Sequence, residues 1–247
     1  MNFYLSTIDE NAQVLAKQYG LGLEIAEYCT AWNLDEKFPE TDAVVRKKIQ
    51  GISDLVFHAP FNELFPCAID PKARELAAYR YRQAVRAAKG YGAVKVVIHG
   101  GYNPRIYYPV WYVEQSVRFW RDFLKEDPGV QIVLENVLEV EPGMLLDIVR
   151  EVDDPRLGLC LDVGHVNAYS QIPVTAWVES WAPYLSHFHL HNNDGTWDTH
   201  SALYGGTIPM EDLLRKIQTL CPEATATLEL TDGESSIKWM EEKIWNP

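Results

Sequence analysis

Six short apolar runs in this chain each end in a histidine or an acidic residue. The runs are VFH (56–58), VVIH (96–99), IVLE (132–135), LCLD (159–162), HFHLH (187–191) and ATLE (226–229). Short runs rich in β-branched residues and leucine are typical of buried strands. Parallel α/β barrels carry their chemistry at the carboxyl ends of their strands. The pattern therefore predicts one barrel whose strand ends converge on a single site.

Strand-like and helix-like segments alternate about eight times along the chain, as repeated βα units do. The expected strands cover residues 3–7, 21–26, 54–58, 93–99, 130–135, 157–162, 184–191 and 224–229. The expected helices cover 9–19, a short stretch after Pro39, 72–89, 110–124, 142–152, 173–181, 209–220 and 235–244. No linker or low-complexity stretch interrupts them. We therefore predict a single-domain (β/α)8 TIM barrel spanning residues 1–247.

Length and charge limit the function classes. The 247 residues, 47% of them hydrophobic, suit one barrel with a large core. Acidic residues outnumber basic ones by 35 to 22, which gives a formal charge of −13. A negative background disfavours binding to a phosphate backbone, so we expect no nucleic-acid partner. Bound divalent cations would weaken this argument, because they reverse the local field.

Cysteine spacing and the distribution of apolar residues argue against a zinc ribbon, a redox motif, a signal peptide and a membrane helix. The four cysteines form no Cys-x-x-Cys pair, so neither a zinc ribbon nor a redox motif is indicated. The chain opens with no signal-peptide pattern, and it contains no apolar stretch of the roughly 18 residues that a membrane helix needs. We expect a cytoplasmic protein with no membrane partner, and we leave its oligomeric state open.

Residues able to bind a metal are concentrated at the ends of the apolar runs or just after them. Five of the seven histidines belong to this set. The candidates are His58, His99, Glu135, Asp162, His165, His189, Asp198, His200 and Glu229. Mixed imidazole and carboxylate ligands suit Zn²⁺, Mn²⁺ or Fe²⁺ better than Ca²⁺. Burying several carboxylates together without a cation would cost desolvation and repulsion energy, which favours a metal site.

The HFHLH run contains three histidines at alternate positions. Side chains alternate between the two faces of a strand, so His187, His189 and His191 share one face. We expect His187 deeper in the barrel and His191 nearer its mouth. One of the three is then a ligand, and the others pack or contact substrate.

Several motifs together resemble the xylose-isomerase-like barrels, a superfamily of sugar and sugar-phosphate isomerases and epimerases that also includes endonuclease IV. The segments that carry the resemblance are His58-Ala59-Pro60, Val97-Ile98-His99-Gly100-Gly101, Leu134-Glu135-Asn136, Cys160-Leu161-Asp162-Val163-Gly164-His165, His189-Leu190-His191 and Asp198-Thr199-His200. The match extends from residue 55 to residue 229. It does not separate the branches of the superfamily.

The resemblance implies ligand sets. The endonuclease pattern implies one metal on His58, His99 and Glu135, a second on Glu135, Asp162, His189 and Glu229, and a third on His165, Asp198 and His200. The isomerase and epimerase pattern implies a metal at the second set only. There Glu135 and Glu229 also act as acid and base, His165 contacts substrate, and His58, His99 and His191 are expected on the substrate pocket.

Two departures from the patterns of the superfamily stand out. Gly205-Gly206 stands where relatives of both branches usually carry a Gly-Glu-Gly turn, and Phe61 stands where endonucleases tend to carry tyrosine. The chain also lacks a basic loop with interleaved aromatic residues, because the run at 46–48 is short and typical of a solvated helix face.

Three functional hypotheses follow. The first is a divalent-metal-dependent isomerase or epimerase of a small sugar, polyol or sugar phosphate, in which Glu135 and Glu229 transfer a proton. The second is a multi-metal phosphoesterase that resembles endonuclease IV. The third is a metal-binding or sugar-binding module without catalysis. We expect zinc or manganese as the cofactor, with one to three ions.

Overall fold

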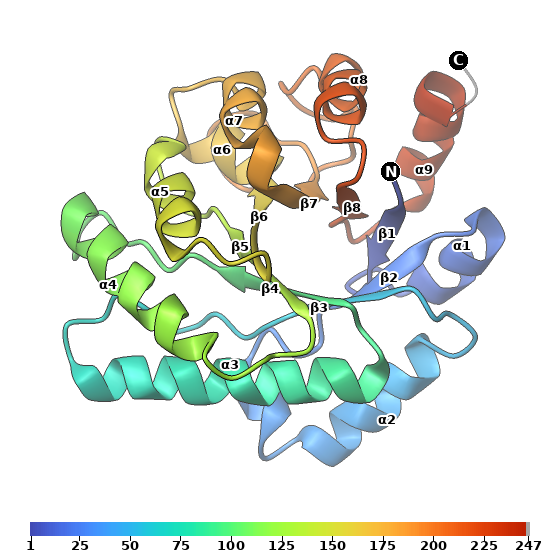
Figure 1. Ribbon diagram of the computed structural model, residues 1–247. Helices are drawn as coiled ribbons and strands as arrows, with labels where there is room; N and C mark the ends of the chain where they lie inside the picture. The colour runs from blue at the N-terminus through green and yellow to red at the C-terminus, as the bar shows by residue number, and fades with distance from the viewer. Residues whose placement is uncertain (246–247) are drawn as a thin grey trace.

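The computed structural model, which describes residues 1–245, is a closed barrel of eight parallel strands paired in chain order. The strands are β1 (Phe3–Ser6), β2 (Gly22–Ile25), β3 (Leu55–His58), β4 (Lys95–His99), β5 (Gln131–Glu135), β6 (Leu157–Asp162), β7 (Leu185–Leu190) and β8 (Thr225–Leu228). Pairing of β8 with β1 closes the barrel. Helices surround the strands on the outside (Figure 1). The predicted (β/α)8 barrel is thus confirmed.

Helices connect successive strands. The α-helices are α1 (Ala12–Tyr19), α2 (Phe38–Lys48), α3 (Pro71–Tyr91), α4 (Pro109–Phe123), α5 (Gly143–Val152), α6 (Val163–Tyr169), α7 (Val174–Trp181), α8 (Met210–Leu220) and α9 (Glu234–Met240). Shorter helical turns are η1 (Ala31–Leu34), η2 (Ala182–Tyr184) and the π-helical η3 (Glu241–Trp245). The ring of Phe3 lies 5.6 Å from that of Trp245, so the first strand packs against the end of the described chain.

Helix α6 was not predicted. It begins directly after β6, because the Asp162 carboxylate accepts a hydrogen bond of 2.7 Å from the backbone N–H of His165 and so caps the new helix. The sequence indicated Asp162 as a metal ligand, and its second role as a helix cap left no separate signal. Capping places His165 on the first turn of a helix at the mouth of the barrel.

Helices α3 and α1 also depart from their predicted bounds. Helix α3 continues through Gly90 to Tyr91, and Gly92 then stops it with a φ of +82°, a left-handed conformation that favours glycine. Helix α1 begins at Ala12, later than the predicted residue 9. The Asp9 carboxylate accepts hydrogen bonds from the backbone N–H groups of Asn11 and Gly233, so it closes a turn there.

The hydrophobic core lies mainly between the strands and the surrounding helices, where large side chains such as Trp120, Trp177 and Phe188 are fully buried. A second, smaller cluster fills the inside of the barrel and consists of Tyr4, Val56, Val97, Val133 and Cys160. Since strand side chains alternate with a period of two, the residue two positions after each of the last four also points inward. Those residues are His58, His99, Glu135 and Asp162.

Among residues 1–245, no helix combines the length and the apolar character that crossing a bilayer requires.

Candidate metal centre

Four side chains from four successive strand ends meet at the carboxyl-terminal mouth of the barrel. Glu135 ends β5, Asp162 ends β6, His189 lies in β7 and Glu229 directly follows β8. Each offers one ligand atom, and these atoms all lie within 4.8 Å of one another. We call these four residues the central group. The four side chains predicted to share one cation are therefore together.

His189 stands at the middle of the central group. Its Nδ1 atom lies 3.1 Å from Oε2 of Glu229, 3.3 Å from Oε1 of Glu135 and 3.8 Å from Oδ2 of Asp162. Within the described chain, Nδ1 of His189 and Oε2 of Glu135 are buried atoms without a hydrogen-bond partner. Orphaned buried polar atoms of this kind are costly unless something else binds them. These atoms fit a divalent cation.

The charge of the central group also favours a bound cation. Burial alone would raise the pKa of Glu135 and Glu229, but the neighbouring His189 lowers both, and that of Glu135 falls well below its usual range. Burial would also raise the pKa of Asp162, but His165 and His191 together lower it. Three ionised carboxylates thus surround one imidazole. A bound cation would offset this excess of negative charge.

His58 and His99 adjoin the central group through Glu135. Their Nε2 atoms lie 3.3 Å and 3.5 Å from the same carboxylate oxygen, Oε2 of Glu135. His58 donates from Nδ1 to the carbonyl of Ala59 over 2.9 Å, so Nε2 is the nitrogen that faces Glu135. Phe61 stacks on the ring of His99 with centroids 4.2 Å apart. His58, His99 and Glu135 form the first flanking group.

A second flanking group contains His191, Asp198 and His200. Oδ2 of Asp198 lies 3.1 Å from Nε2 of His200 and 3.2 Å from Nε2 of His165. The resemblance placed His165, Asp198 and His200 together, and the structure brings these three together around Asp198. It also adds His191, whose Nε2 lies 3.1 Å from Asp162. Nδ1 of His191 and Oδ1 of Asp198 have no hydrogen-bond partner in residues 1–245.

His187 lies deeper in the barrel than the two histidines that follow it, as expected. Its Nδ1 contacts the hydroxyl of Thr225 at 2.6 Å, and Thr225 is the first residue of β8. Burial lowers the pKa of His187 to about 4, so the ring is neutral near pH 7.

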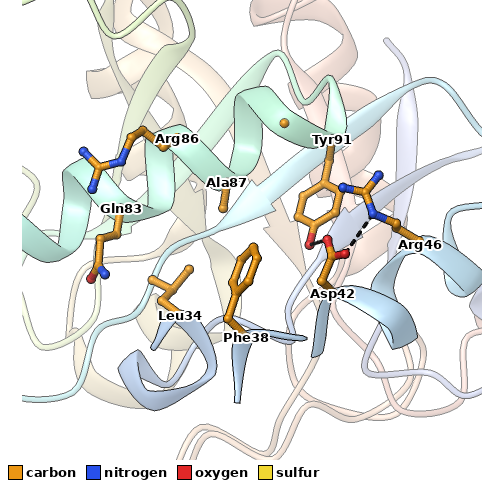
Figure 2. Close-up of a pocket in the computed structure, with 9 residues that line it drawn as sticks. Leu34, Phe38, Asp42, Arg46, Gln83, Arg86, Ala87 and Tyr91 are labelled. Atoms are coloured by element: carbon orange, nitrogen blue, oxygen red, sulfur yellow. Dashed lines mark hydrogen bonds and ion pairs between the residues drawn. The ribbon is translucent and has the colours of Figure 1, made fainter. Parts of the chain in front are cut away.

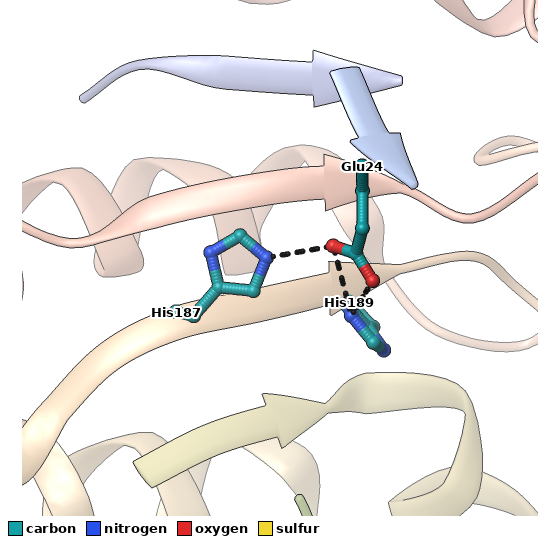
Figure 3. Close-up of side chains that lie close together, drawn as sticks. All are labelled: Glu24, His187 and His189. Atoms are coloured by element: carbon teal, nitrogen blue, oxygen red, sulfur yellow. Dashed lines mark hydrogen bonds and ion pairs between the residues drawn. The ribbon is translucent and has the colours of Figure 1, made fainter. Parts of the chain in front are cut away.

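Sequence reasoning missed Glu24. This residue of β2 is 1% exposed, and its carboxylate contacts both His187 and His189 (Figure 3). A signal for it existed, because Glu24 stands inside the apolar run 21–26 at an inward-facing position. The run 21–26 ends in alanine rather than in a ligand residue. A search of the last residue of each run therefore does not find Glu24.

A pocket on the outer surface of the molecule is unrelated to this centre. It lies between η1, α2 and α3, where Leu34, Phe38 and Tyr91 border it and Asp42 pairs with Arg46 (Figure 2). Its lining residues come from helices outside the barrel rather than from strand ends. We assign it no part in the chemistry of the mouth.

The chain belongs to the xylose isomerase-like TIM barrel family, whose sequence profile matches residues 15–244. A relative in Methanocaldococcus jannaschii, the uncharacterized protein MJ1311, is 28% identical over 196 residues, which cover 75% of this chain and 67% of that protein.

Two solved structures share the fold over the whole chain. A D-tagatose 3-epimerase-like protein superposes with a TM-score of 0.82 at 24% identity, covering 99% of this chain and 97% of its own. The TTHB071 protein from Thermus thermophilus, in crystals soaked with ZnCl₂, gives a TM-score of 0.77 at 26% identity, covering 100% of this chain and 99% of its own.

Proposed function

We propose that the protein is a divalent-metal-dependent isomerase or epimerase acting on a small sugar, polyol or sugar phosphate. The observation that carries this proposal is the central group, in which three buried carboxylates and one imidazole converge with orphaned ligand atoms. Similarity to a D-tagatose 3-epimerase-like protein supports the choice of a sugar substrate.

Glu135, Asp162, His189 and Glu229 would hold the cation. Mixed oxygen and nitrogen ligands suit zinc or manganese, and the zinc-soaked Thermus thermophilus structure supports a metal of this type. The chemistry that a bound cation supplies is polarisation of substrate oxygens, which acidifies the hydrogen on the neighbouring carbon.

The two glutamates carry the proton. The side chain of Glu229 is 15% exposed and that of Glu135 is 1% exposed, so Glu229 is the more accessible to a substrate at the mouth. Both are ionised, which a base requires. Glu229 removes the proton from the substrate carbon, and Glu135, after it has taken up a proton from solvent, delivers that proton to the same carbon or its neighbour. Return to the opposite face of the same carbon gives an epimer, and return to the neighbour gives an isomer.

The flanking histidines bind and orient the substrate in this proposal. His165 lies on the first turn of α6 with its side chain 10% exposed, and it reaches Asp198 and the central group. His99 has a side chain 17% exposed and lies under Phe61, which makes a half-apolar wall for a sugar ring. His58 supports that wall. His191 is fully buried, and we place it with the second flanking group rather than with the substrate.

Solvent isotope exchange tests this function. Protein loaded with Zn²⁺ or Mn²⁺ is incubated in D₂O with a panel of ketoses, aldoses and their phosphates, and the products are examined by NMR. We expect deuterium on the carbon that receives the proton. Turnover without deuterium uptake would indicate a hydride shift, and absence of turnover on every sugar tested would reject the proposal.

A second candidate function is a multi-metal phosphoesterase. The observation that favours it is the presence of two flanking groups, joined to the central group through Glu135 and through Asp162. In such enzymes neighbouring metals stabilise both the attacking and the leaving oxygen. The formal charge of −13 weighs against a DNA substrate. The number of metal ions per chain separates the candidates, since three ions favour hydrolysis and one favours isomerisation.

A further inference from the structure

We propose that Glu24 is a positioning residue that holds a proton on Nε2 of His189 and thereby turns the Nδ1 lone pair toward the central group. This inference rests on the proposed function, because it assigns a role in binding the same metal. Glu24 lies in β2 and is not a member of the central group. Its carboxylate contacts Nε2 of His189 (Figure 3). Glu135 and Glu229 lie at the other ring nitrogen, Nδ1.

The argument begins with the two nitrogens of His189. Nε2 lies 3.0 Å from Oε1 of Glu24 and 3.3 Å from its Oε2. An ionised carboxylate only accepts hydrogen bonds, so Nε2 must carry a proton in this contact. That holds whether the ring is neutral or charged. The only nitrogen of His189 that can offer a lone pair is then Nδ1, which faces Glu135 and Glu229.

A chain of hydrogen bonds inside the barrel fixes Glu24 in turn. Its start is Lys95, a donor only, whose Nζ donates to the hydroxyl of Thr225 over 2.7 Å. Thr225 can therefore donate onward to Nδ1 of His187, 2.6 Å away. His187 then donates from Nε2 to the hydroxyl of Thr227 over 2.9 Å.

The chain ends at the carboxylate. The hydroxyl of Thr227 donates to Oε2 of Glu24 over 2.5 Å, and Nε2 of His187 also lies 3.2 Å from that oxygen. Because the hydroxyl proton of Thr227 is used on Glu24, Nε2 of His187 must carry the proton of the bond to Thr227. Both of these protons therefore point toward Glu24. The carboxylate cannot turn away from His189 without breaking these bonds.

Glu24, His187 and His189 could also be regarded as a metal site of their own, since their ligand atoms lie within 4.8 Å of one another. The hydrogen bonds argue against that. Nε2 of His187 and Nε2 of His189 already donate to Glu24 or its neighbour Thr227. Protonated nitrogens cannot bind a cation. Glu24 therefore acts on the central group only through its hydrogen bond to Nε2 of His189.

Removal of a carboxylate that is hydrogen-bonded to a histidine ligand lowers metal affinity by a known range. A carboxylate behind a histidine ligand orients the ring and makes it a stronger base, and its removal typically costs about 10–100-fold in metal affinity. We expect Glu24→Gln to weaken Zn²⁺ binding by that factor. The amide preserves the shape of the side chain, so the fold should be retained. It has a single acceptor oxygen, so its NH₂ group must face one of the donors that meet the carboxylate, which are Nε2 of His187, Nε2 of His189 and the Thr227 hydroxyl.

Zinc affinity is measured for the full chain by competition with a chromophoric chelator, using Zn²⁺ alone as the probe. The matched control is Glu139→Gln, because Glu139 is also a buried carboxylate, 2% exposed, but it contacts Tyr112 and the backbone of Val137 instead. We expect the control to bind Zn²⁺ within about threefold of the wild type, since it changes no group that touches a proposed ligand. Equal affinity of Glu24→Gln and wild type would overturn the positioning role alone.

A second measurement needs no variant. Nitrogen-15 NMR of the histidine rings in the wild-type protein reports which nitrogen of His189 carries a proton. We expect the proton on Nε2 in the metal-free protein and, after Zn²⁺ is added, metal on Nδ1 with Nε2 still protonated. Metal on Nε2, or a lone pair there without metal, would overturn the inference even if Glu24→Gln failed to fold. A wild-type protein that binds no Zn²⁺ would instead overturn the proposed function, and the positioning role with it.

Discussion

The imidazole rings of His191 and His200 stack with their centroids 4.0 Å apart and their planes 5° from parallel. His200 takes a left-handed backbone conformation, with φ of 47°, that is uncommon for a residue other than glycine. Its Nδ1 also donates to the carbonyl of Glu229 over 2.9 Å. The loop after β7 is thus attached to the end of β8 beside the central group.

This attachment leads to a first prediction. His200→Ala removes a member of the second flanking group but no member of the central group. We expect it, like His58→Ala, to leave one ion per chain with an affinity within about tenfold of the wild type. Glu135→Ala should abolish binding of that ion, because it removes a central ligand. Metal analysis after dialysis against Zn²⁺ measures all three. Equal loss of metal in the three variants would show that the groups bind as one cluster.

The second prediction concerns Glu229. Glu229→Gln should retain the fold and most of the bound metal, because an amide oxygen can still ligate weakly. It should lose proton transfer, so incorporation of solvent deuterium into substrate should fall by about 10²–10⁴-fold. The matched control is Glu223→Gln, an exposed glutamate near the start of β8. Full exchange activity in Glu229→Gln would exclude this residue as the base.

The third prediction separates the two reaction classes by charge. An endonuclease must neutralise several phosphates, and its affinity falls with salt by a slope of about 0.9 per phosphate contacted. With 35 acidic against 22 basic residues, we expect no measurable binding to an abasic-site duplex in about 150 mM salt. Fluorescence anisotropy with a labelled duplex makes the measurement. Nicking of that duplex, abolished equally by His58→Ala, His200→Ala and Glu135→Ala, would establish the phosphoesterase instead.

The fourth prediction tests the packing behind the centre. A Cβ atom added at Gly164 in α6 would lie 1.9 Å from Cε1 of His191, so Gly164→Ala must displace that ring. We expect a loss of about 1–3 kcal/mol in the free energy of unfolding, as overpacking usually costs. The control is Gly90→Ala in α3, where nothing lies within 4 Å of the added atom. There we expect a gain of about 0.5–1 kcal/mol, because alanine favours a helix interior. Chemical denaturation of both variants measures the difference, and a Gly164→Ala protein as stable as the wild type would contradict the packing.

Much of the fold could be predicted from local pattern. The strand 157–162 has the predicted bounds, and each of the other strands is shorter than predicted by one or two residues. Apolar runs and their spacing are properties of short segments, so they are visible before the chain folds. Helix α6 was not predicted, because Asp162 was interpreted as a candidate metal ligand and not as the residue that caps a helix.

The sequence alone determined the barrel and most of the candidate metal-binding side chains. Most strands carry a candidate ligand at an inward position near their ends, and closure of parallel strands then brings those ends to one mouth. Only the tertiary structure decided the contacts between those side chains. His191 joins Asp198, and Glu24 reaches His189 across 165 residues of chain. Such pairs depend on how far each strand is shifted along its neighbours around the closed barrel, and local periodicity does not determine that register.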